Sequence, residues 1–141
     1  MSVSPDEVFA VLANPYSYEN WLVGCKKIRS VEGEWPAPGS LFHHRVGFGP
    51  IEIADNTKAI ESDAPRRLVL EARARPVGVA RVAFDLEPHP EGTLVTMTET
   101  PVRGVAARFH NAVLDGMVKG RNAESLRRLQ KLFERDAAET G

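Results

Sequence analysis

Two ionisable residues of the strand-forming part of the chain, His44 and Glu99, are the strongest candidates for chemistry. Asp115 and Asn122, in the C-terminal segment, supply polar groups that could assist them. An aldol-type cyclisation or a dehydration needs a base for an acidic C–H proton and hydrogen-bond donors for the developing enolate. Because burial in an apolar cavity raises the pKa of a carboxyl group, Glu99 would suit the role of base. The same residues could instead orient the polar end of a bound molecule.

Other kinds of site find less support in the sequence. His43 and His44 are adjacent, so on a strand they point to opposite faces and cannot hold one metal ion together. Cys25 opens a predicted strand beside Lys26 and Lys27, which gives no support to a Cys–His nucleophile pair. No lysine-ended glycine-rich loop leads into a helix. We therefore expect no metal and no cofactor.

Length and composition limit the functional classes. The chain has 141 residues, 43% of them apolar, which fits one domain over residues 1–141. Its net charge of -1 gives no field that would attract nucleic acid or anionic lipid. Its single cysteine fits a reducing cytoplasm, and no apolar run approaches the ~18 residues of a membrane span. We expect a cytoplasmic protein without a nucleic-acid partner and without stable membrane insertion.

The C-terminal segment positions part of the candidate site. Residues 105–138 contain no proline and are predicted to form one long helix. At about 100° per residue, an apolar stripe runs through Leu126, Leu129 and Phe133. The N-terminal half of the same face mixes polar with apolar residues: Asn111, Leu114, Asp115, Val118 and Asn122. Since an unpaired buried polar group costs about 1–3 kcal/mol, this half is predicted to face a cavity rather than packed side chains.

Two glycines, Gly116 and Gly120, fall on the opposite side of this helix. Each costs about 1 kcal/mol relative to alanine in a helix interior. Either the helix bends at this point, or the glycines let another chain approach closely. A homodimer is therefore among the partners considered.

The first part of the chain carries helix signals and then strand signals. Ser4 and Pro5 mark the start of a short helix that stops at Asn14. Trp21 closes an aromatic turn, where it either packs in the core or contacts a ligand. The period then changes from 3.6 to 2, which predicts strands. Their ranges are Cys25–Val31, Leu41–Phe48, Ile51–Ile60, Leu68–Arg75, Val79–Leu86 and Thr93–Thr100.

Short connections between these strands predict an antiparallel meander, and the flanking helices make the fold class α+β. Alternation along the fourth strand turns Ala72 inward, where it leaves volume unfilled, and sends Glu71, Arg73 and Arg75 to water. Small inward residues with a few convergent polar groups are typical of a ligand pocket. The predicted ligand-binding residues are Trp21, Phe42, Phe48, Leu70, Ala72, Phe84, Met97, Leu114, Val118 and Asn122.

Alternation also turns His44 and Glu99 toward this pocket, where they are the candidate catalytic residues. The alternative for Glu99 is a solvated carboxylate past the useful end of its strand. The alternative for His44 is a histidine with satisfied hydrogen bonds, or a register that makes His43 the inward residue.

Seven short motifs, in their order along the chain, are similar to those of a known family. They are Ser4–Phe9, Pro15–Trp21, Pro38-Gly39, Pro65–Leu68, Phe84–Pro88, Gly92–Glu99 and Arg121–Leu126. From about Val3 to Arg135 the chain resembles the START-like helix-grip superfamily (SRPBCC), in its polyketide cyclase/dehydrase branch. The resemblance implies a curved antiparallel sheet wrapped around a long C-terminal helix, with a hydrophobic cavity between them.

The function that the resemblance implies is binding of a small hydrophobic molecule. Members bind lipids, sterols, polyketides, plant hormones or other apolar molecules, and only some members are enzymes. We therefore expect a carrier or sensor of a lipid- or polyketide-like ligand, with a polyketide cyclase/dehydrase as the alternative. No cyclase active-site set matches this chain, so no catalytic residue is carried over from the family.

The chain departs from the family pattern at its start. Members usually have a strand before the Ser-Pro helix, whereas only Met1, Ser2 and Val3 precede it here. Either that strand is a stub, or it lies upstream of this sequence. One edge of the sheet is then expected to be exposed, at the strand Cys25–Val31 or at the last strand.

Overall fold

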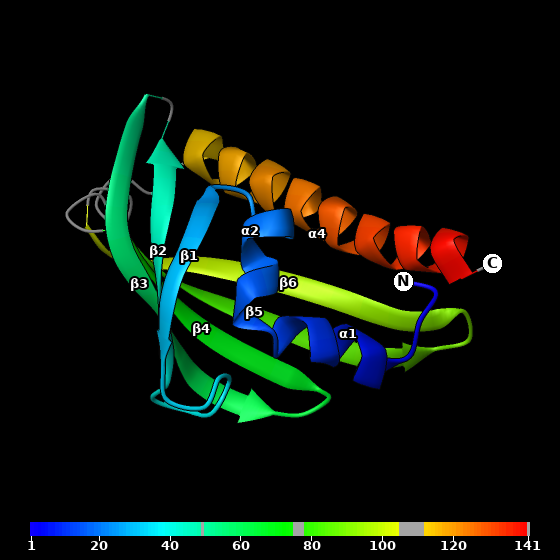
Figure 1. Ribbon diagram of the computed structural model, residues 1–141. Coiled ribbons are helices and arrows are strands. Elements are labelled where there is room, and N and C mark those ends of the chain that lie inside the picture. The colour runs from blue at the N-terminus through cyan, green and yellow to red at the C-terminus, as the bar shows by residue number, and fades with distance from the viewer. Residues whose placement is uncertain (49, 75–77, 105–111, 141) are drawn as a thin grey trace.

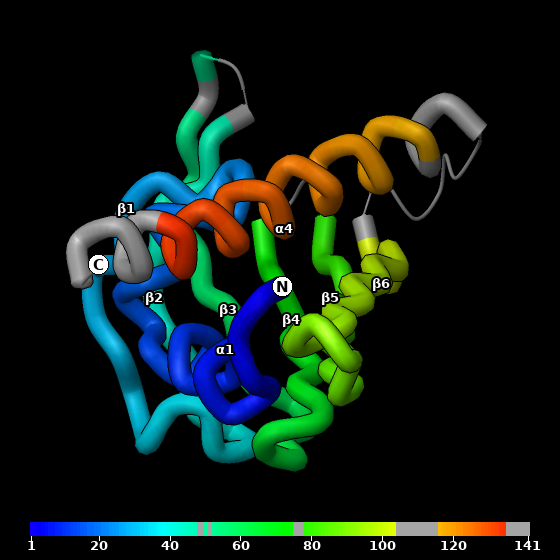
Figure 2. Tube along the Cα trace, turned by 90° about the vertical axis from the view of Figure 1, so that its right-hand side faces the viewer, coloured from blue at the N-terminus to red at the C-terminus, as the bar shows by residue number. Residues whose placement is uncertain are grey.

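The computed structural model describes residues 1–48, 50–74, 78–104 and 112–140, with side chains except at 48, 51, 104, 112–115 and 135–140. A curved sheet of six antiparallel strands holds a long C-terminal helix, α4 (Ala112–Thr140), across its open side (Figures 1 and 2). The six strands pair in the order in which they follow along the chain. The predicted α+β helix-grip architecture is therefore confirmed.

The N-terminal helices begin as their sequence signals predict. Helix α1 spans Pro5–Leu12, and the Ser4 hydroxyl accepts a hydrogen bond from the Glu7 N–H at 3.3 Å. The 3-10 turn η1 spans Pro15–Ser17, and helix α2 spans Tyr18–Trp21. Tyr18 and Trp21 are fully buried, with ring centroids 4.8 Å apart, so they form part of the core.

The six strands follow the predicted order. They are β1 Cys25–Glu32, β2 Leu41–Phe48, β3 Ile51–Asp63, β4 Arg67–Ala74, β5 Gly78–His89 and β6 Gly92–Gly104. Four of them, β1, β3, β5 and β6, are longer than predicted. The connection between the fifth and sixth strands turns at Pro90 and Glu91, and Pro88, expected to lie in this turn, belongs to β5 and pairs with Thr93. Pro101 follows the predicted end of the sixth strand at Thr100, and in the structure it lies within β6. β6 is an edge strand, and the position of Pro101 that lacks an N–H faces its free edge, where proline is tolerated.

Residues Met1 to Val3 lie beside the start of β6. The Met1 amino group donates to the Thr93 carbonyl oxygen at 2.7 Å, and the Thr93 N–H donates to the Met1 carbonyl oxygen at 2.8 Å. The Thr93 hydroxyl donates to the Val3 carbonyl oxygen at 2.6 Å. Met1 to Val3 thus form a short stub beside β6. The two edge strands of the sheet are β1 and β6.

Helix α4 spans Ala112–Thr140, and the predicted residues 105–111 lie outside the described residues. Leu129 is fully buried in the core, with Leu126 and Phe133 packed against it. Gly116 and Gly120 are exposed, and nothing lies within 4 Å of the position that a Cβ atom would take on either. The C-terminal half of the apolar stripe therefore fixes the helix on the sheet.

One predicted solvent position is buried. Glu71, assigned to water by alternation, is only 9% exposed. Its Oε1 atom accepts hydrogen bonds from Arg73 Nε at 3.2 Å and from Arg103 Nη2 at 2.9 Å. Long arginine side chains cover the carboxylate, a possibility that alternation does not consider. Arg75 lies outside the described residues.

Truncation of Leu129 tests the docking of α4. We expect Leu129→Ala to lower the free energy of unfolding by about 2–5 kcal/mol, because it opens a hole in a closed core. Gln130→Ala, at an exposed position of the same helix, should change it by no more than about 0.5 kcal/mol. Urea denaturation measures both values, and equal effects of the two changes would contradict the assigned stripe.

Candidate functional site

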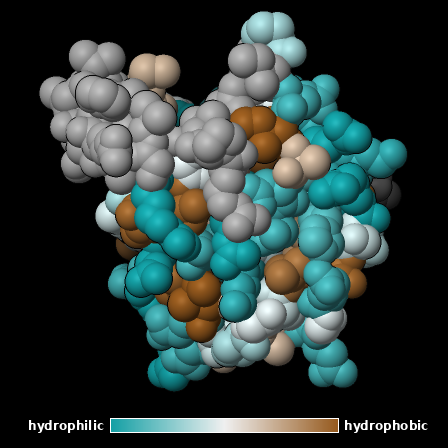
Figure 3. Space-filling model, turned by 90° about the vertical axis from the view of Figure 1, so that its left-hand side faces the viewer, coloured by the Kyte–Doolittle hydropathy of each residue, from teal (hydrophilic) through white to brown (hydrophobic). Residues whose placement is uncertain are grey.

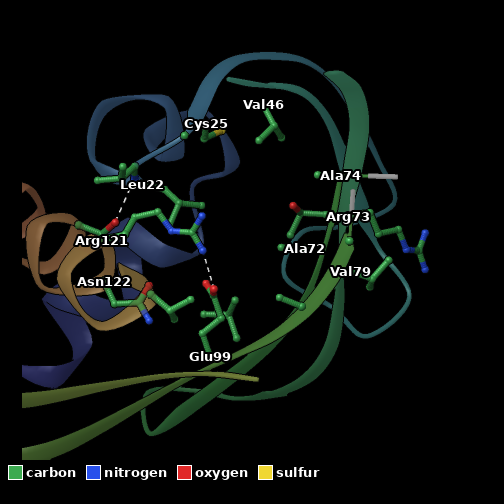
Figure 4. Close-up of a pocket in the computed structure, with 18 of the residues that line it drawn as sticks. Leu22, Cys25, Val46, Ala72, Arg73, Ala74, Val79, Glu99, Arg121 and Asn122 are labelled. Atoms are coloured by element: carbon green, nitrogen blue, oxygen red, sulfur yellow. Dashed lines mark hydrogen bonds and ion pairs between the residues drawn. The ribbon is translucent and has the colours of Figure 1, made fainter. Parts of the chain in front are cut away.

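A cavity of about 480 Å³ lies between the concave side of the sheet and the N-terminal half of α4 (Figure 4). Its volume falls within the roughly 300–1,000 Å³ of small-molecule sites. Its apolar wall comes from the segment before β1, from β2, β4, β5 and β6, and from the helix. The main apolar lining residues are Leu22, Val23, Val46, Ala72, Ala74, Val79, Ala80, Val82, Pro101, Met117 and Val118.

Small residues on β4 and β5 create this space. Ala72 pairs with Ala80, and Ala74 pairs with Gly78, so two neighbouring cross-strand pairs lack bulk on the wall. Cross-strand partners point to the same face of a sheet, so neither residue of a pair can fill the gap that the other leaves. The cavity therefore follows directly from the small inward positions in the sequence.

Several residues predicted to line the cavity fill the core instead. Trp21, Phe42 and Phe84 are fully buried, Leu70 is nearly so, and Met97 packs against them. Among them, the rings of Trp21 and Phe84 meet edge to face, with centroids 5.8 Å apart. These five are not among the residues that line the cavity, because alternation gives the direction of a side chain but not whether its bulk closes the space.

Other predicted residues do lie on the cavity wall. They are His44, Ala72, Glu99, Val118 and Asn122. The side chains of Phe48, Leu114 and Asp115 lie outside the described residues, as does Asn111. The helix and the sheet thus bring together the polar residues that the sequence analysis singled out, with Asp115 left undescribed.

His44 lies on the cavity wall and has a hydrogen-bond partner at one of its two ring nitrogens. It is 3% exposed, and its Nε2 atom lies 2.8 Å from the Thr57 hydroxyl oxygen. Its Nδ1 atom is buried and has no hydrogen-bond partner among the described residues. Burial lowers the pKa of His44, while the Asn56 backbone and the charge of Asp55 oppose that shift. Burial thus favours the neutral form of the His44 imidazole.

Glu99 points inward from β6 and forms an ion pair with the helix. Its side chain is 9% exposed, and its Oε2 atom accepts a hydrogen bond from Arg121 Nη2 at 2.5 Å (Figure 4). Sequence reasoning missed Arg121, because its Cα lies about 80° from the centre of the apolar stripe. The signal available was its place beside Asn122, since a long side chain there can reach the wall.

Cys25 also lines the cavity, at the start of β1. Burial raises the pKa of its thiol to about 12, and the charge of Glu19 adds to that shift. A thiol with so high a pKa stays protonated and is a poor nucleophile. Cys25 therefore contributes an apolar surface to the wall.

Metal ligands and membrane spans were also sought in the described part of the chain. No three His, Cys, Asp or Glu side chains gather there in a way that could hold a metal ion. None of the described helices is both long and apolar enough to cross a bilayer. On the face shown in Figure 3, hydrophobic residues form separate small patches among hydrophilic ones.

Comparison with protein families identifies the chain. Residues 1–134 match the family model described as polyketide cyclase / dehydrase and lipid transport. The chain belongs to this family. The search of curated proteins finds no match. Family membership supports a ligand-binding or cyclase role, and it leaves the ligand open.

Solved structures share the fold at low sequence identity. Protein NE0264 of Nitrosomonas europaea has a TM-score of 0.71 and 18% identity, over 98% of this chain and 92% of that one. A protein of Rhodobacter sphaeroides has a TM-score of 0.72 and 21% identity, over 96% and 87%. The di-domain ARO/CYC StfQ from the steffimycin biosynthetic pathway has a TM-score of 0.71 and 10% identity, over 97% and 49%. At these identities the likeness shows the fold alone.

The buried imidazole of His44 should make the fold less stable in acid. Its folded-state pKa is lowered from 6.5, so the unfolded chain takes up the proton first as the pH falls. The stability that the neutral imidazole of His44 contributes is fully present above the unfolded-state pKa of about 6.5, and it is lost as the pH falls below that value. His44→Gln should therefore lose less stability than the wild type between about pH 7 and 5.5, measured by urea denaturation. His89→Gln, at an exposed position, serves as the control, and equal losses in all three proteins would contradict the expectation.

Proposed function

We propose that this protein binds a small, largely apolar molecule in the cavity between the sheet and α4 and acts as its carrier or sensor. The observation that carries this proposal is the pair of small cross-strand contacts, Ala72 with Ala80 and Ala74 with Gly78, beneath the helix. A sheet that only had to pack against α4 would carry larger side chains there, since unfilled space in a core costs stability.

The lining supports an apolar ligand with a limited polar part. Most lining residues are aliphatic or small, and the polar groups come from few positions, including Glu99, Arg121 and Asn122. Burial of apolar ligand surface provides about 25 cal/mol per Å², so the wall favours a hydrocarbon body. The few polar groups would set the orientation of the ligand.

Filling the cavity tests this proposal. We expect Ala72→Phe to abolish binding of the neutral apolar fluorophore N-phenyl-1-naphthylamine, because the new ring occupies the space between β4 and α4. Ala54→Phe, at an exposed position of β3, is the matched control and should bind the fluorophore as the wild type does. Fluorescence titration measures binding, and circular dichroism checks the fold. Binding that survives in a folded Ala72→Phe protein would place the ligand elsewhere.

A cyclase or dehydrase acting on a polyketide-like substrate is the second candidate function. The observation that favours it is the position of Glu99, a carboxylate on the wall of an apolar cavity. Among proteins of the same fold, StfQ is described as an ARO/CYC of a biosynthetic pathway. In such an enzyme, Glu99 would take the acidic C–H proton, and N–H donors of Arg121 and Asn122 would stabilise the enolate oxygen.

Glu99→Gln distinguishes the enzyme from the carrier. This change keeps the shape of the side chain and removes its charge. For an enzyme, we expect turnover of a synthetic poly-β-ketone thioester to fall at least about a hundredfold, with a much smaller change in affinity. Product formation is followed by liquid chromatography and mass spectrometry, with heat-denatured protein as the blank. A wild-type protein that binds the thioester without converting it would exclude the enzyme for this substrate.

A further inference from the structure

The side-chain amide of Asn122 has hydrogen-bonding capacity that the described residues do not use. Asn122 is 7% exposed and lines the cavity, and its amide makes no hydrogen bond with any described residue. Figure 4 shows it projecting from α4 on the cavity side. An asparagine amide offers two N–H donors and a carbonyl acceptor. When an apolar ligand displaces water from the cavity, Asn122 keeps a partner only if the ligand supplies one.

The ion pair beside Asn122 also has unused capacity. A single hydrogen bond, from Arg121 Nη2 to Glu99 Oε2, joins the two side chains, and no other described residue bonds to either. Glu99 Oε1 can therefore accept a hydrogen bond, and other N–H groups of Arg121 can donate. The charges of the pair cancel, so this side of the cavity offers donors and acceptors without net charge.

The remaining charged lining residue does not alter this balance. Arg73 contributes to the wall, but Figure 4 shows its guanidinium group directed away from the cavity. On the outer side of the sheet, Arg73 donates to Glu71 at 3.2 Å and to Asn56 at 2.8 Å. Among the described lining residues, the Glu99–Arg121 pair thus supplies the charges that face the ligand.

We infer that the cavity selects an apolar molecule with a neutral oxygen-bearing end, a hydroxyl or a ketone, and disfavours a ligand carboxylate. The inference rests on the proposed function of ligand binding. A ketone oxygen accepts hydrogen bonds from Asn122 and Arg121, and a hydroxyl group also donates to Glu99. A pure hydrocarbon would leave Asn122 unpaired in a dry cavity.

Electrostatics disfavours the carboxylate. An ionised ligand would bring a second negative charge beside Glu99, with only the Arg121 guanidinium to balance both. It must either share Arg121 with Glu99 or displace Glu99, which would then remain unpaired on a wall where its side chain is 9% exposed. A neutral oxygen avoids both costs.

Four ligands of equal chain length test the selection: 2-octanone, 1-octanol, octane and octanoate, at about pH 8. Each displaces N-phenyl-1-naphthylamine from the protein, which gives its affinity. Asn122→Leu should lower the affinities for 2-octanone and 1-octanol by about five- to tenfold relative to the affinity for octane, which is the effect of losing one hydrogen bond. Gln130→Leu, at an exposed position of α4, is the matched control and should leave all four affinities at their wild-type values.

Glu99→Gln tests the electrostatic part of the inference, because it is expected to raise the affinity for octanoate. The change frees Arg121 and gives the cavity a positive charge, so the affinity of octanoate relative to 2-octanone should rise at least about tenfold. That rise should shrink as the salt concentration increases. Because this variant does not involve Asn122, it tests the inference even if Asn122→Leu fails to fold.

The outcomes separate the inference from the proposed function. If Asn122→Leu weakens octane as much as 2-octanone, or if Glu99→Gln leaves the octanoate preference unchanged, the neutral-end selection is overturned while ligand binding stands. Wild-type protein that binds octanoate as tightly as 2-octanone would also overturn it. If wild-type protein binds neither the fluorophore nor any of the four ligands, the proposed function itself fails, and the inference with it.

Discussion

The burial of Leu129 in the aromatic core is the contact on which the rest of the structure depends. It fixes the C-terminal half of α4 over the end of the sheet that is filled by Trp21, Phe42 and Phe84. The Ser125 hydroxyl oxygen accepts a hydrogen bond from the Val23 N–H at 3.0 Å, which ties the middle of the helix to the segment before β1. Because a helix is stiff, its N-terminal half then spans the part of the sheet where small residues leave space.

The cavity results from an uneven distribution of side-chain volume along one sheet. Large rings close one end, and Ala72, Ala74, Gly78 and Ala80 hollow the other. A closed core at one end supplies the stability that an open cavity at the other end lowers. The arrangement lets one helix serve two purposes, since the half docked on the core holds the other half over the ligand space.

The polar part of the site comes from two elements that are distant in sequence. Strand β6 turns Glu99 inward, and α4 carries Arg121 to within hydrogen-bond distance of it. An ion pair with one side chain 9% and the other 40% exposed is partly shielded from water, which strengthens the attraction between its charges. Beside this ion pair, Asn122 of α4 offers a neutral amide to a ligand. The polarity of the cavity is therefore set jointly by the sheet and the helix.

The sequence by itself determined the order of the strands, the helix stripe through Leu129, and the inward direction of His44 and Glu99, because these depend on local periodicity. It could not determine that Phe42 and Phe84 fill the core while Ala72 borders a cavity, since this depends on how side chains from separate strands share one volume. It also could not show the partner of Glu99 or the covered position of Glu71. Long arginine side chains reach across elements in ways that no periodicity encodes, so only the tertiary structure decided these contacts.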